Sequence, residues 1–597
     1  MAPRFVHVAV FALASCDAPR TTVEAEPAEP SRDDAPATTA SEGDASTSSA
    51  PATFVEPTPT PTPVDAVPPS TAELALERPP GFGTIRPELP VPKPEELTVH
   101  ALAGFEVVAI HMRPDLESPR LGYLRMGQRT MVTAKLDDQD KECPKGFYGL
   151  PAGGFACASK GLLVDATKEP YMYLPPLPPR IDRPIPYDYG VIASDGTPLW
   201  WRMADADEIR LATQRYEAEV AAAAPADTDP NAQPDANPDA NPDAPKPAPT
   251  KKKKAGPRMP GEETPDDEPL PDVDDAPPPE LTPEEIEKQK RHEAAERKRA
   301  EAQAEGERER AKELARKAAR LPLSAKSPFL EAGMVITLGE KVKDDGRSWW
   351  RTTRGAFVQS HRAWRKEPTD FHGGEVPAGA TSFGFVIEDV ASASAIAKRG
   401  KLEWKRKLGF RELLVFTAQA EVGGHTYLVT ADGLHVRNSD MRMARPATRP
   451  EEVRPYERWI DVDLERQLLV AYDGDVPVYA TLVSTGKKGT AEESFLTPAG
   501  KFRITTKHVS SSMDGDTASD GAYSIQDVPW AMFFHGSYAL HGAFWHSKFG
   551  SRRSHGCVNL GPTDARWLFN WTMPFVPQTW HGVAAHPGAP GSMVVVH

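Results

Sequence analysis

The chain has 597 residues, and length alone suggests about four domains. Its 62 prolines crowd into stretches that cannot pack, so less of the chain should be globular. The net charge of −15 argues against nucleic acid as a partner, because no clustered basic sequence offsets it and the lysine run at residues 251–254 is too short. No segment has the roughly 18 consecutive apolar residues that would suggest a membrane-spanning helix.

The N-terminus has the features of an export signal. Arg4 precedes a short apolar run that ends in small residues and Cys16. The string L-A-S-C at Leu13–Cys16 resembles the bacterial lipobox, in which the cysteine receives lipid and becomes the first residue of the mature protein. The resemblance implies a signal peptide at residues 1–16 and a lipoprotein at the periplasmic face of a bacterial membrane. A chance cysteine or a wrongly chosen start codon is the alternative.

Residues 17–93 are rich in proline, alanine and threonine, with P-T-P-T-P-T-P at Pro57–Pro63. Too little apolar side chain is present to offset the entropy of ordering, so a disordered tether is predicted. Such a tether would hold the folded part of a lipid-anchored protein well away from the membrane.

Residues 97–202 are predicted to form a small β module. Alternating apolar runs at Val107–Met112 and Gly127–Ala134 indicate strands, and turn residues separate them. The order of these runs resembles a bacterial Src-homology-3-like barrel. Tyr148 and Phe155 are expected either in its core or on a peptide-binding face.

Cys143 and Cys157 have thirteen residues between them in a glycine-rich stretch of this module. An exported chain favours a disulfide between them, and two free buried thiols are the alternative. A zinc site would need more ligands nearby, and the neighbouring sequence offers none.

Two further segments are predicted to have no core of their own. Residues 221–279 form a low-complexity linker with N-P-D-A twice in succession. Residues 283–320 carry dense glutamate, lysine, arginine and alanine without an apolar stripe, which is typical of a solvated single helix. A coiled-coil partner would need leucines at heptad positions, and these are missing until Leu314.

Globular sequence resumes at residues 327–450, where one or two small β modules are predicted. Gly346–Val358 resembles a strand pair of the same module type. In Gly423–Arg437 an A-D-G turn separates two apolar alternations, which is a strong hairpin signal. In total, two or three small β-barrel modules should precede the last domain.

Residues 458–597 are again rich in predicted strands. W-I-D-V-D-L, Q-L-L-V-A-Y and P-V-Y-A-T-L follow one another, and Asp473-Gly474 makes the turn between the second and third. One clear helix is predicted at Pro562–Trp571, with its proline suited to a first turn. The fold class is therefore mainly β, with long disordered linkers and one charged helix.

The string S-H-G-C-V-N-L at Ser554–Leu560, together with His541-Gly542, carries the strongest functional signal. A cysteine reacts as its thiolate, so it needs an imidazole within reach and backbone donors for the oxyanion that forms on attack. Gly556 lets a substrate carbonyl approach the backbone N–H groups beside Cys557, and His541 can arrive on a neighbouring strand as base. These residue types imply a thiol acyltransferase or hydrolase. A buried structural cysteine between unrelated histidines is the alternative.

These residues resemble the L,D-transpeptidases, the YkuD-like family, whose pattern is His-Gly, a spacer, and Ser/Thr-His-Gly-Cys followed by an apolar residue and Asn or Arg. The twelve-residue spacer between His541 and Ser554 is short for the family. Two weaker marks stand upstream in the right order, V-S-T-G at Val483–Gly486 and T-P-A-G-K-F at Thr497–Phe502. The resemblance covers about residues 458–597 and implies a β-sandwich catalytic domain.

The resemblance also implies a reaction. Cys557 would attack a carbonyl of a peptidoglycan stem peptide and form a thioester, with His541 as general base. The amine of a second stem, or of a protein to be attached to the wall, would accept the acyl group, and no cofactor is needed. Four residues would hold the oxyanion or orient the loop: Ser554, His555, Gly556 and Asn559.

Four residues beside the motif are candidate substrate contacts: Trp545, His546, Arg552 and Arg553. Guanidinium groups bind carboxylates bidentately, although a solvated basic turn is an equal alternative. Nearby histidines invite a zinc site, but no metal-ligand spacing such as H-E-x-x-H exists, so no metal is predicted. Two other functions stay open. One is an L,D-carboxypeptidase or hydrolase, in which water replaces the amine, and the other is a non-catalytic peptidoglycan-binding lipoprotein.

Overall fold

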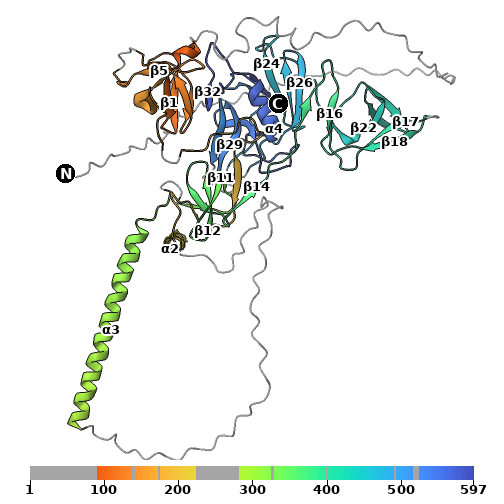
Figure 1. Cartoon of the computed structure of the whole chain (residues 1–597). Coiled ribbons are helices and arrows are strands. Elements are labelled where there is room, and N and C mark those ends of the chain that lie inside the picture. Colours follow the sequence, from red (N-terminus) through yellow and green to blue (C-terminus); the bar gives the residue numbers. More distant parts are fainter. Residues whose placement is uncertain are drawn as a thin grey trace, which may run out of the picture. The chain divides into compact units, whose positions relative to one another are not determined.

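The structure is a computed structural model that describes residues 91–136, 141–172, 175–223, 282–324, 328–397, 400–489, 493–514 and 524–597. The chain divides into two units, Met1–Val67 and Pro68–His597, and every described residue lies in the second. The predicted signal peptide with Cys16, nearly all of the predicted tether and most of the predicted linker lie outside the described residues. The described part is mainly β, as predicted (Figure 1).

The first module contains the strands β1 (Val99–Ala103), β2 (Val107–His111), β3 (Arg120–Arg125), β4 (Arg129–Val132), β5 (Phe147–Gly149), β6 (Phe155–Cys157) and β7 (Leu162–Asp165), with 3-10 turns at Pro94–Glu96 and Ala158–Lys160. Strands β4, β1 and β7 form one sheet, and β3, β2, β6 and β5 follow one another in a second. Tyr148 is buried in the module core. Cys143 and Cys157 form a disulfide, and Phe155 packs beside them. The resemblance to Src-homology-3 barrels stays a prediction.

The second module is built from two distant stretches of the chain. Its strands are β8 (Asp188–Ile192), β9 (Thr197–Pro198), β10 (Phe329–Leu330), β11 (Val335–Asp344), β12 (Arg347–Thr352), β13 (Phe357–Gln359) and β14 (Ala363–Lys366). β8 pairs with β11 and β14, and β9 pairs with β10. The module boundary predicted at residue 202 is therefore wrong, because β8 and β9 fold with residues 329–366 and share their core.

The helix α2 (Ala206–Ala223), which the sequence analysis missed, follows β9. A capping box fixes its start. The N–H of Glu208 donates to Asp205 Oδ1 at 2.8 Å, and the N–H of Asp205 donates to Glu208 Oε2 at 3.1 Å. Leu211 and Ala212 on one side of the helix are buried. The first residues of the linker predicted at 221–279 are thus helical.

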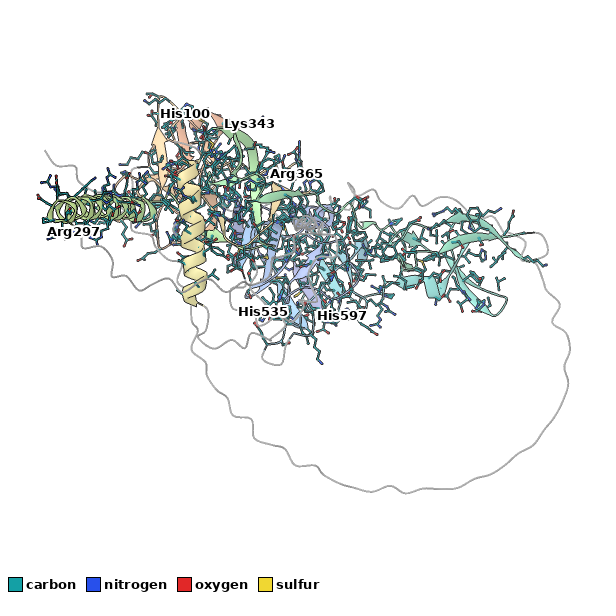
Figure 2. All side chains as sticks on the ribbon, turned by 90° about the horizontal axis from the view of Figure 1, so that it is seen from below. His100, Arg297, Lys343, Arg365, His535 and His597 are labelled. Carbon is teal, nitrogen blue, oxygen red and sulfur yellow. A yellow bond between two sulfur atoms is a disulfide. The ribbon has the colours of Figure 1, made fainter. Side chains whose placement is uncertain are left out.

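The helix α3 (Pro283–Ala318) agrees with the charged helix predicted at residues 283–320. Ion pairs three or four residues apart follow its surface, and the side chains in them are largely exposed. Figure 2 shows these side chains projecting from the helix, with Arg297 labelled. Within the described part of the chain, neither this helix nor any other is long and apolar enough to cross a membrane.

The third module contains β16 (Phe383–Val386), β17 (Ser392–Ile396), β18 (Leu402–Lys407), β19 (Leu413–Val415), β20 (Ala418–Val422), β21 (His425–Val429), β22 (Leu434–Arg437) and β23 (Met441–Met443), with a 3-10 turn at Asn438–Asp440. The sheets have the orders β18-β17-β22-β21-β20 and β19-β16-β23. β21 and β22 form the hairpin predicted around the A-D-G turn. The residues predicted as one or two modules at 327–450 therefore contribute to two.

The last domain is a sandwich of two sheets. One has the order β15-β26-β25-β24-β33-β27, made of β15 (Gly374–Glu375), β24 (Arg458–Asp463), β25 (Leu468–Asp473), β26 (Val476–Leu482), β27 (Gly500–Arg503) and β33 (Met593–Val596). The other holds β28 (Thr506–Asp514), β29 (Ser524–His535), β30 (Tyr538–Gly542), β31 (Val558–Leu560) and β32 (Gly582–Ala584). The helix α4 (Pro562–Trp571) has the predicted bounds. Side chains of both sheets and of α4 share one apolar core, for example Ile460, Trp530 and Leu568.

This domain begins earlier than the predicted residue 458. β15 pairs with β26, and the N–H of Gly373 donates at 2.8 Å to the buried carboxylate of Asp564 in α4. Tyr479 and Thr481 donate to the same carboxylate, at 2.7 and 2.6 Å. The third module is therefore an insertion between β15 and β24. A two-residue strand has no periodic pattern, so the sequence could not reveal it.

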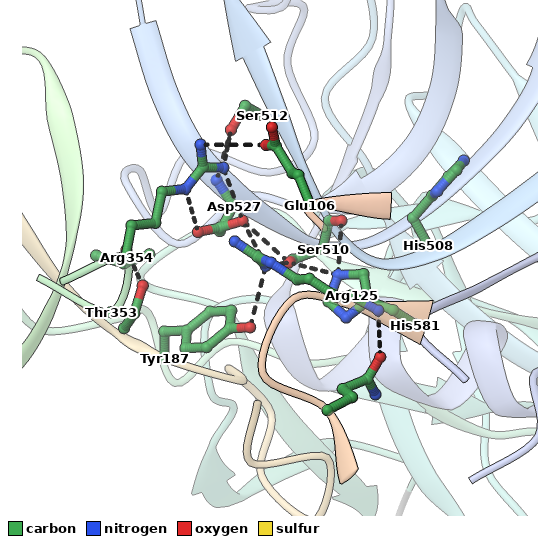
Figure 3. A network of polar contacts seen from close by, with 12 residues as sticks. Glu106, Arg125, Tyr187, Thr353, Arg354, His508, Ser510, Ser512, Asp527 and His581 are labelled. Carbon is green, nitrogen blue, oxygen red and sulfur yellow. Dashed lines mark hydrogen bonds and ion pairs between the residues drawn. The ribbon is translucent and has the colours of Figure 1, made fainter. Parts of the chain in front are cut away.

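Several contacts join the first two modules to this domain, among them the pairing of β11 with β29 and the two described next. β3 pairs with β32, and a Cβ on Gly122 would lie 2.2 Å from the carbonyl oxygen of Gly582, so only glycine fits there. The second contact centres on Asp527 of β29, which receives Arg125 of β3 at 2.8 Å and Arg354 of the β12–β13 turn at 3.2 Å (Figure 3). Burial would raise the pKa of Asp527, but the two guanidinium charges outweigh it and hold the pKa at about 2.

Candidate active site

Cys557 and His541 lie on neighbouring strands. β30 and β31 run parallel, with Leu540 opposite Val558. Cys557 directly precedes β31, and its thiol donates to the carbonyl oxygen of Ser537 at 3.7 Å. Side chains alternate between the two faces of a sheet, so Leu540 and Val558 enter the core while His541 and Cys557 share the opposite face. The fold therefore places the predicted nucleophile and base on the same face of neighbouring strands.

Burial sets the protonation state of both groups. His541 is 2% exposed, and burial lowers its pKa to about 4. Although Cys557 keeps some exposed surface, its surroundings raise the pKa of the thiol to about 11 by burial. Nδ1 of His541 donates to the carbonyl oxygen of Gly542 at 3.4 Å, which leaves a lone pair on Nε2. At neutral pH the site thus holds a neutral imidazole that can accept a proton and a thiol that can give one.

Ser554 shapes the loop that presents the thiol. Its hydroxyl donates to the carbonyl oxygen of Cys557 at 2.5 Å and accepts the N–H of Gly556 at 3.1 Å. Gly556 has a φ of +118°, and a Cβ there would lie 2.3 Å from the ring of Tyr538. Ser554 thus has the orienting position expected of it. The N–H of Gly556, expected to meet the oxyanion, is already engaged by Ser554.

The two weaker motifs hold the same loop. The hydroxyl of Thr497 donates to the carbonyl oxygen of Gly556 at 2.8 Å and accepts the N–H of Gly486 at 2.9 Å. Ser484 and Asn559 exchange two backbone hydrogen bonds, of 2.9 and 3.0 Å. V-S-T-G and T-P-A-G-K-F therefore act together as a clamp on the nucleophile loop, which explains physically why they accompany the cysteine motif.

Arg552 is a structural link. Its guanidinium donates to the carbonyl oxygens of Gly486 and Leu464, at 3.3 and 3.1 Å. These bonds commit the side chain to the loop, so its geometry does not support the substrate contact considered for it. The ring of His555 packs edge-on against Phe495, with 4.5 Å between ring centroids.

Trp545 and His546 lie near the His541 imidazole, and the charge of Arg553 acts on His546. Trp545 stacks on His541, with 5.7 Å between ring centroids. Nε2 of His546 lies 3.0 Å from the side-chain amide of Asn559, on the strand that follows the thiol. Burial, followed by the positive charge of Arg553 and further cations, lowers the pKa of His546 to about 3. His546 is therefore uncharged at neutral pH, and positively charged side chains surround it.

Two arginines of the third module, which the sequence analysis missed, reach the loop between His541 and Ser554. Arg411 donates to the carbonyl oxygen of Ser547, and Arg442 donates to that of Gly550 at 2.6 Å. Both lie more than 100 residues before the motif, in a module without a motif of its own. No local pattern could have assigned them, because the contact depends on how the insertion packs.

The described residues contain no group of three His, Cys, Asp or Glu side chains that could hold a metal ion. The four histidines near the motif each have another neighbour: the Tyr538 ring for His535, the Gly542 carbonyl for His541, the Asn559 amide for His546 and the Phe495 ring for His555.

A thiol and a basic imidazole on one face of adjoining strands form the arrangement that thiol acyltransferases and hydrolases use. Comparison with known proteins narrows this class. Residues 457–596 match the YkuD family, the L,D-transpeptidase catalytic domain, which confirms the resemblance carried by the motifs. The match covers the last domain from β24 onwards, without β15, and does not extend to the first two modules or the third.

Several proteins are similar to this part of the chain. The Bacillus subtilis protein named "Putative L,D-transpeptidase YciB" is 26% identical over 127 residues, which cover 19% of this chain and 59% of that protein. The catalytic domain of an E. faecium L,D-transpeptidase is 26% identical and covers 24% of this chain and 98% of that chain, with a TM-score of 0.19. An L,D-transpeptidase of Xylanimonas cellulosilytica is 24% identical and covers 26% of this chain and 65% of that one, with a TM-score of 0.19. This chain thus spans less than two thirds of the B. subtilis and Xylanimonas proteins.

Proposed function

We propose that the last domain is a cysteine-dependent L,D-transpeptidase that acts on peptidoglycan stem peptides through a thioester. The observation that carries the proposal is the shared face of His541 and Cys557, with Nε2 of the imidazole left basic by the bond from Nδ1 to Gly542. The family match of residues 457–596 supports the substrate class.

In the acylation half-reaction, Sγ of Cys557 attacks the carbonyl carbon of the peptide bond after the third residue of a donor stem. Nε2 of His541 takes the thiol proton as the S–C bond forms. Backbone N–H groups of the nucleophile loop hold the oxyanion. As the C–N bond breaks, the imidazolium returns the proton to the departing amine, which leaves as D-alanine.

In the transfer half-reaction, an acceptor amine attacks the thioester carbonyl. Its proton passes to His541 and then to the sulfur of Cys557 as the C–S bond breaks. The product contains a new amide, and the enzyme returns to its neutral thiol and neutral imidazole. Water in place of the amine would give an L,D-carboxypeptidase by the same steps.

The test is mass spectrometry of the full-length protein incubated with purified stem peptides and an acceptor amine. We expect an acyl-enzyme on Cys557 and a cross-linked product, both lost in Cys557→Ala. If the donor peptide is shortened by its terminal D-alanine, ends in a free carboxylate and forms no cross-link, the enzyme is a carboxypeptidase. A protein that forms neither acyl-enzyme nor product would be a non-catalytic peptidoglycan-binding protein, and the proposal would fail.

We also propose that the protein is exported and held at the periplasmic face of a bacterial membrane by lipid on Cys16. The L-A-S-C string at Leu13–Cys16 supports this location. The disulfide between Cys143 and Cys157 suits it, because such bonds persist in oxidising compartments outside the cytoplasm.

A further inference from the structure

Positive side chains gather beside the loop that joins His541 to the nucleophile. Three of them act on the pKa of His546, and a fourth acts on that of Arg411; the four are Arg411, Arg442, Lys366 and Arg553. Among the described residues, no carboxylate lies within ion-pair distance of any of them, although Asp389 acts on Arg411 and Asp463 acts on Arg442 from farther away. Like charges that are not paired with a carboxylate repel one another, so an anion bound among them would stabilise the cluster.

Arg411 is the member that the fold holds most tightly. It lies between β18 and β19 with a φ of +63°, a left-handed conformation that side chains other than glycine rarely adopt. Hydrogen bonds between its N–H and the carbonyl oxygen of Val386, and between the N–H of Val386 and the carbonyl oxygen of Glu412, fix this turn at 2.8 and 3.0 Å. The module therefore holds Arg411 in a strained backbone conformation, from which its side chain reaches the carbonyl oxygen of Ser547.

The guanidinium of Arg411 has N–H donors that no described residue engages. One Nη1 hydrogen meets the carbonyl oxygen of Ser547, and the group lies over the rings of Phe371 and Phe410, at 5.3 and 4.6 Å from their centroids. Nε is enclosed without a hydrogen-bond partner in the described structure. A guanidinium has five N–H donors, so Nη2 and the second Nη1 hydrogen can meet a further acceptor. Bracing the loop accounts for only one of these donors.

The cluster lies close to the chemistry. Ser547, which accepts from Arg411, is next to His546, and His546 contacts the side-chain amide of Asn559. Asn559 lies opposite His541 and two residues after Cys557. These contacts connect Arg411 to the strand that carries Asn559, opposite His541. A peptide whose carbonyl reaches Cys557 would therefore have its anionic groups near these cations.

We propose that the third module completes the substrate site, with Arg411 as the main ligand, supported by Arg553 and Lys366, for a carboxylate of the acyl-donor peptide. The proposal rests on the proposed function and names its substrate class, an acidic peptide. It also gives the inserted module a role, because Arg411 lies outside the YkuD-matched segment 457–596.

The test compares two donor peptides that differ only in one side-chain or α-carboxyl group, free in one and carboxamide in the other. With the full-length protein, Arg411→Gln should raise KM for the acidic peptide at least about ten-fold, since charge-assisted hydrogen bonds contribute about 1.5–3 kcal/mol. KM for the amidated peptide and both kcat values should change little. Arg411→Lys should recover part of the loss. The matched control is Arg437→Gln, an exposed arginine of the same module that contacts His425.

If Arg411→Gln lowers the activity on both peptides equally, Arg411 only braces the loop and the proposal is refuted. If the variant does not fold, the wild-type protein decides alone. The proposal is also refuted if the wild-type protein does not prefer the acidic peptide over the amidated one, or if added salt does not weaken that preference.

A second measurement separates this proposal from the proposed function. Iodoacetate and iodoacetamide both alkylate a thiol with loss of iodide, but only iodoacetate is an anion. We expect the rate of alkylation of Cys557 by iodoacetate, divided by the rate with iodoacetamide, to fall about five-fold in Arg411→Gln, as expected for removal of one nearby charge. The same ratio should stay unchanged in Arg437→Gln. This ratio tests the cationic site even if no transpeptidase product forms, and an unchanged ratio would show that Arg411 does not attract anions to the thiol.

Discussion

Replacement of His541 by glutamine should change how the reaction of Cys557 depends on pH. With a thiol pKa of about 11, only about one molecule in ten thousand carries a thiolate at pH 7. The pKa of His541 is about 4, so nearly all molecules have a basic imidazole at that pH. Acylation of the wild type should therefore be almost independent of pH between about 5 and 10, and it should fall below that range as His541 becomes protonated.

The variant His541→Gln lacks the base and must rely on the thiolate. Its acylation rate should be about 10²–10⁴ times lower at pH 7, the usual contribution of a positioned base. Because the thiolate fraction rises ten-fold per pH unit below the thiol pKa, the variant should be about 100-fold faster at pH 9 than at pH 7. The two profiles should converge towards high pH.

The assay is intact-mass measurement of acylation by a carbapenem at a series of quenched times, from pH 5.5 to 9. His535→Gln, at the exposed end of β29, is the matched control and should keep the wild-type profile. A wild-type rate that rises ten-fold per pH unit would mean that a thiolate forms before attack without help from a base. A flat profile that is lost in His555→Gln and kept in His541→Gln would show that the wrong imidazole was assigned.

Three further outcomes follow from the structure and the sequence. Asp527→Asn should lower the thermal midpoint by several degrees at pH 7, because a pKa held at about 2 instead of 3.8 corresponds to about 2–3 kcal/mol. That difference should shrink as pH falls from about 4 towards 2, where the carboxylate of the wild type is also protonated. Proteolysis within residues 224–281 should give two fragments that co-elute on gel filtration, since β8 pairs with β11 and β14 across the cut; separate elution would contradict the assembly of the second module. Cys16→Ser should move the protein from the membrane to the soluble fraction without loss of specific activity, and a membrane-bound variant would exclude lipid on that residue.

The sequence predicted the parts of the site that are local. Ser554, Gly556 and Cys557 are neighbours in the chain, and their bonding pattern needs a hydroxyl, a glycine and a thiol at fixed spacing. The helix α4 was predicted with its bounds because its proline marks the start. The clamp formed by Thr497 and Ser484 could be recognised only as a family mark, because its hydrogen bonds cross more than fifty residues.

The errors in the fold concern pairing between distant segments. β8 was assigned to the first module because it follows that module in sequence, whereas its hydrogen-bond partners come more than 140 residues later. Strand patterns reveal which face is apolar, but they do not name the partner strand. The missed helix α2 is a different case, since the capping pair Asp205 and Glu208 was readable from the sequence.

The strand that leads to His541 depends on the upstream modules. Asp527 and Trp530 on β29 have φ values of +52° and +57°, and such strained residues persist only where their surroundings fix them. Ser510 and Ser512 of β28 hold Asp527 from within the matched segment, and further contacts come from outside it. Tyr189 donates to the carbonyl oxygen of Asp527, and the indole N–H of Trp530 donates to the carbonyl oxygen of Pro184, each at 2.6 Å.

The two arginines that bind the carboxylate of Asp527 come from the first and second modules. β29 continues directly into β30, which carries His541, so a change in the strained segment would shift the base relative to Cys557. The third module acts on the opposite side of the site, through Arg411 and the loop before the thiol. The upstream modules are therefore more than spacers in front of the matched domain. Two of them shape the strand that positions the base, and the third reaches the loop that leads to the nucleophile.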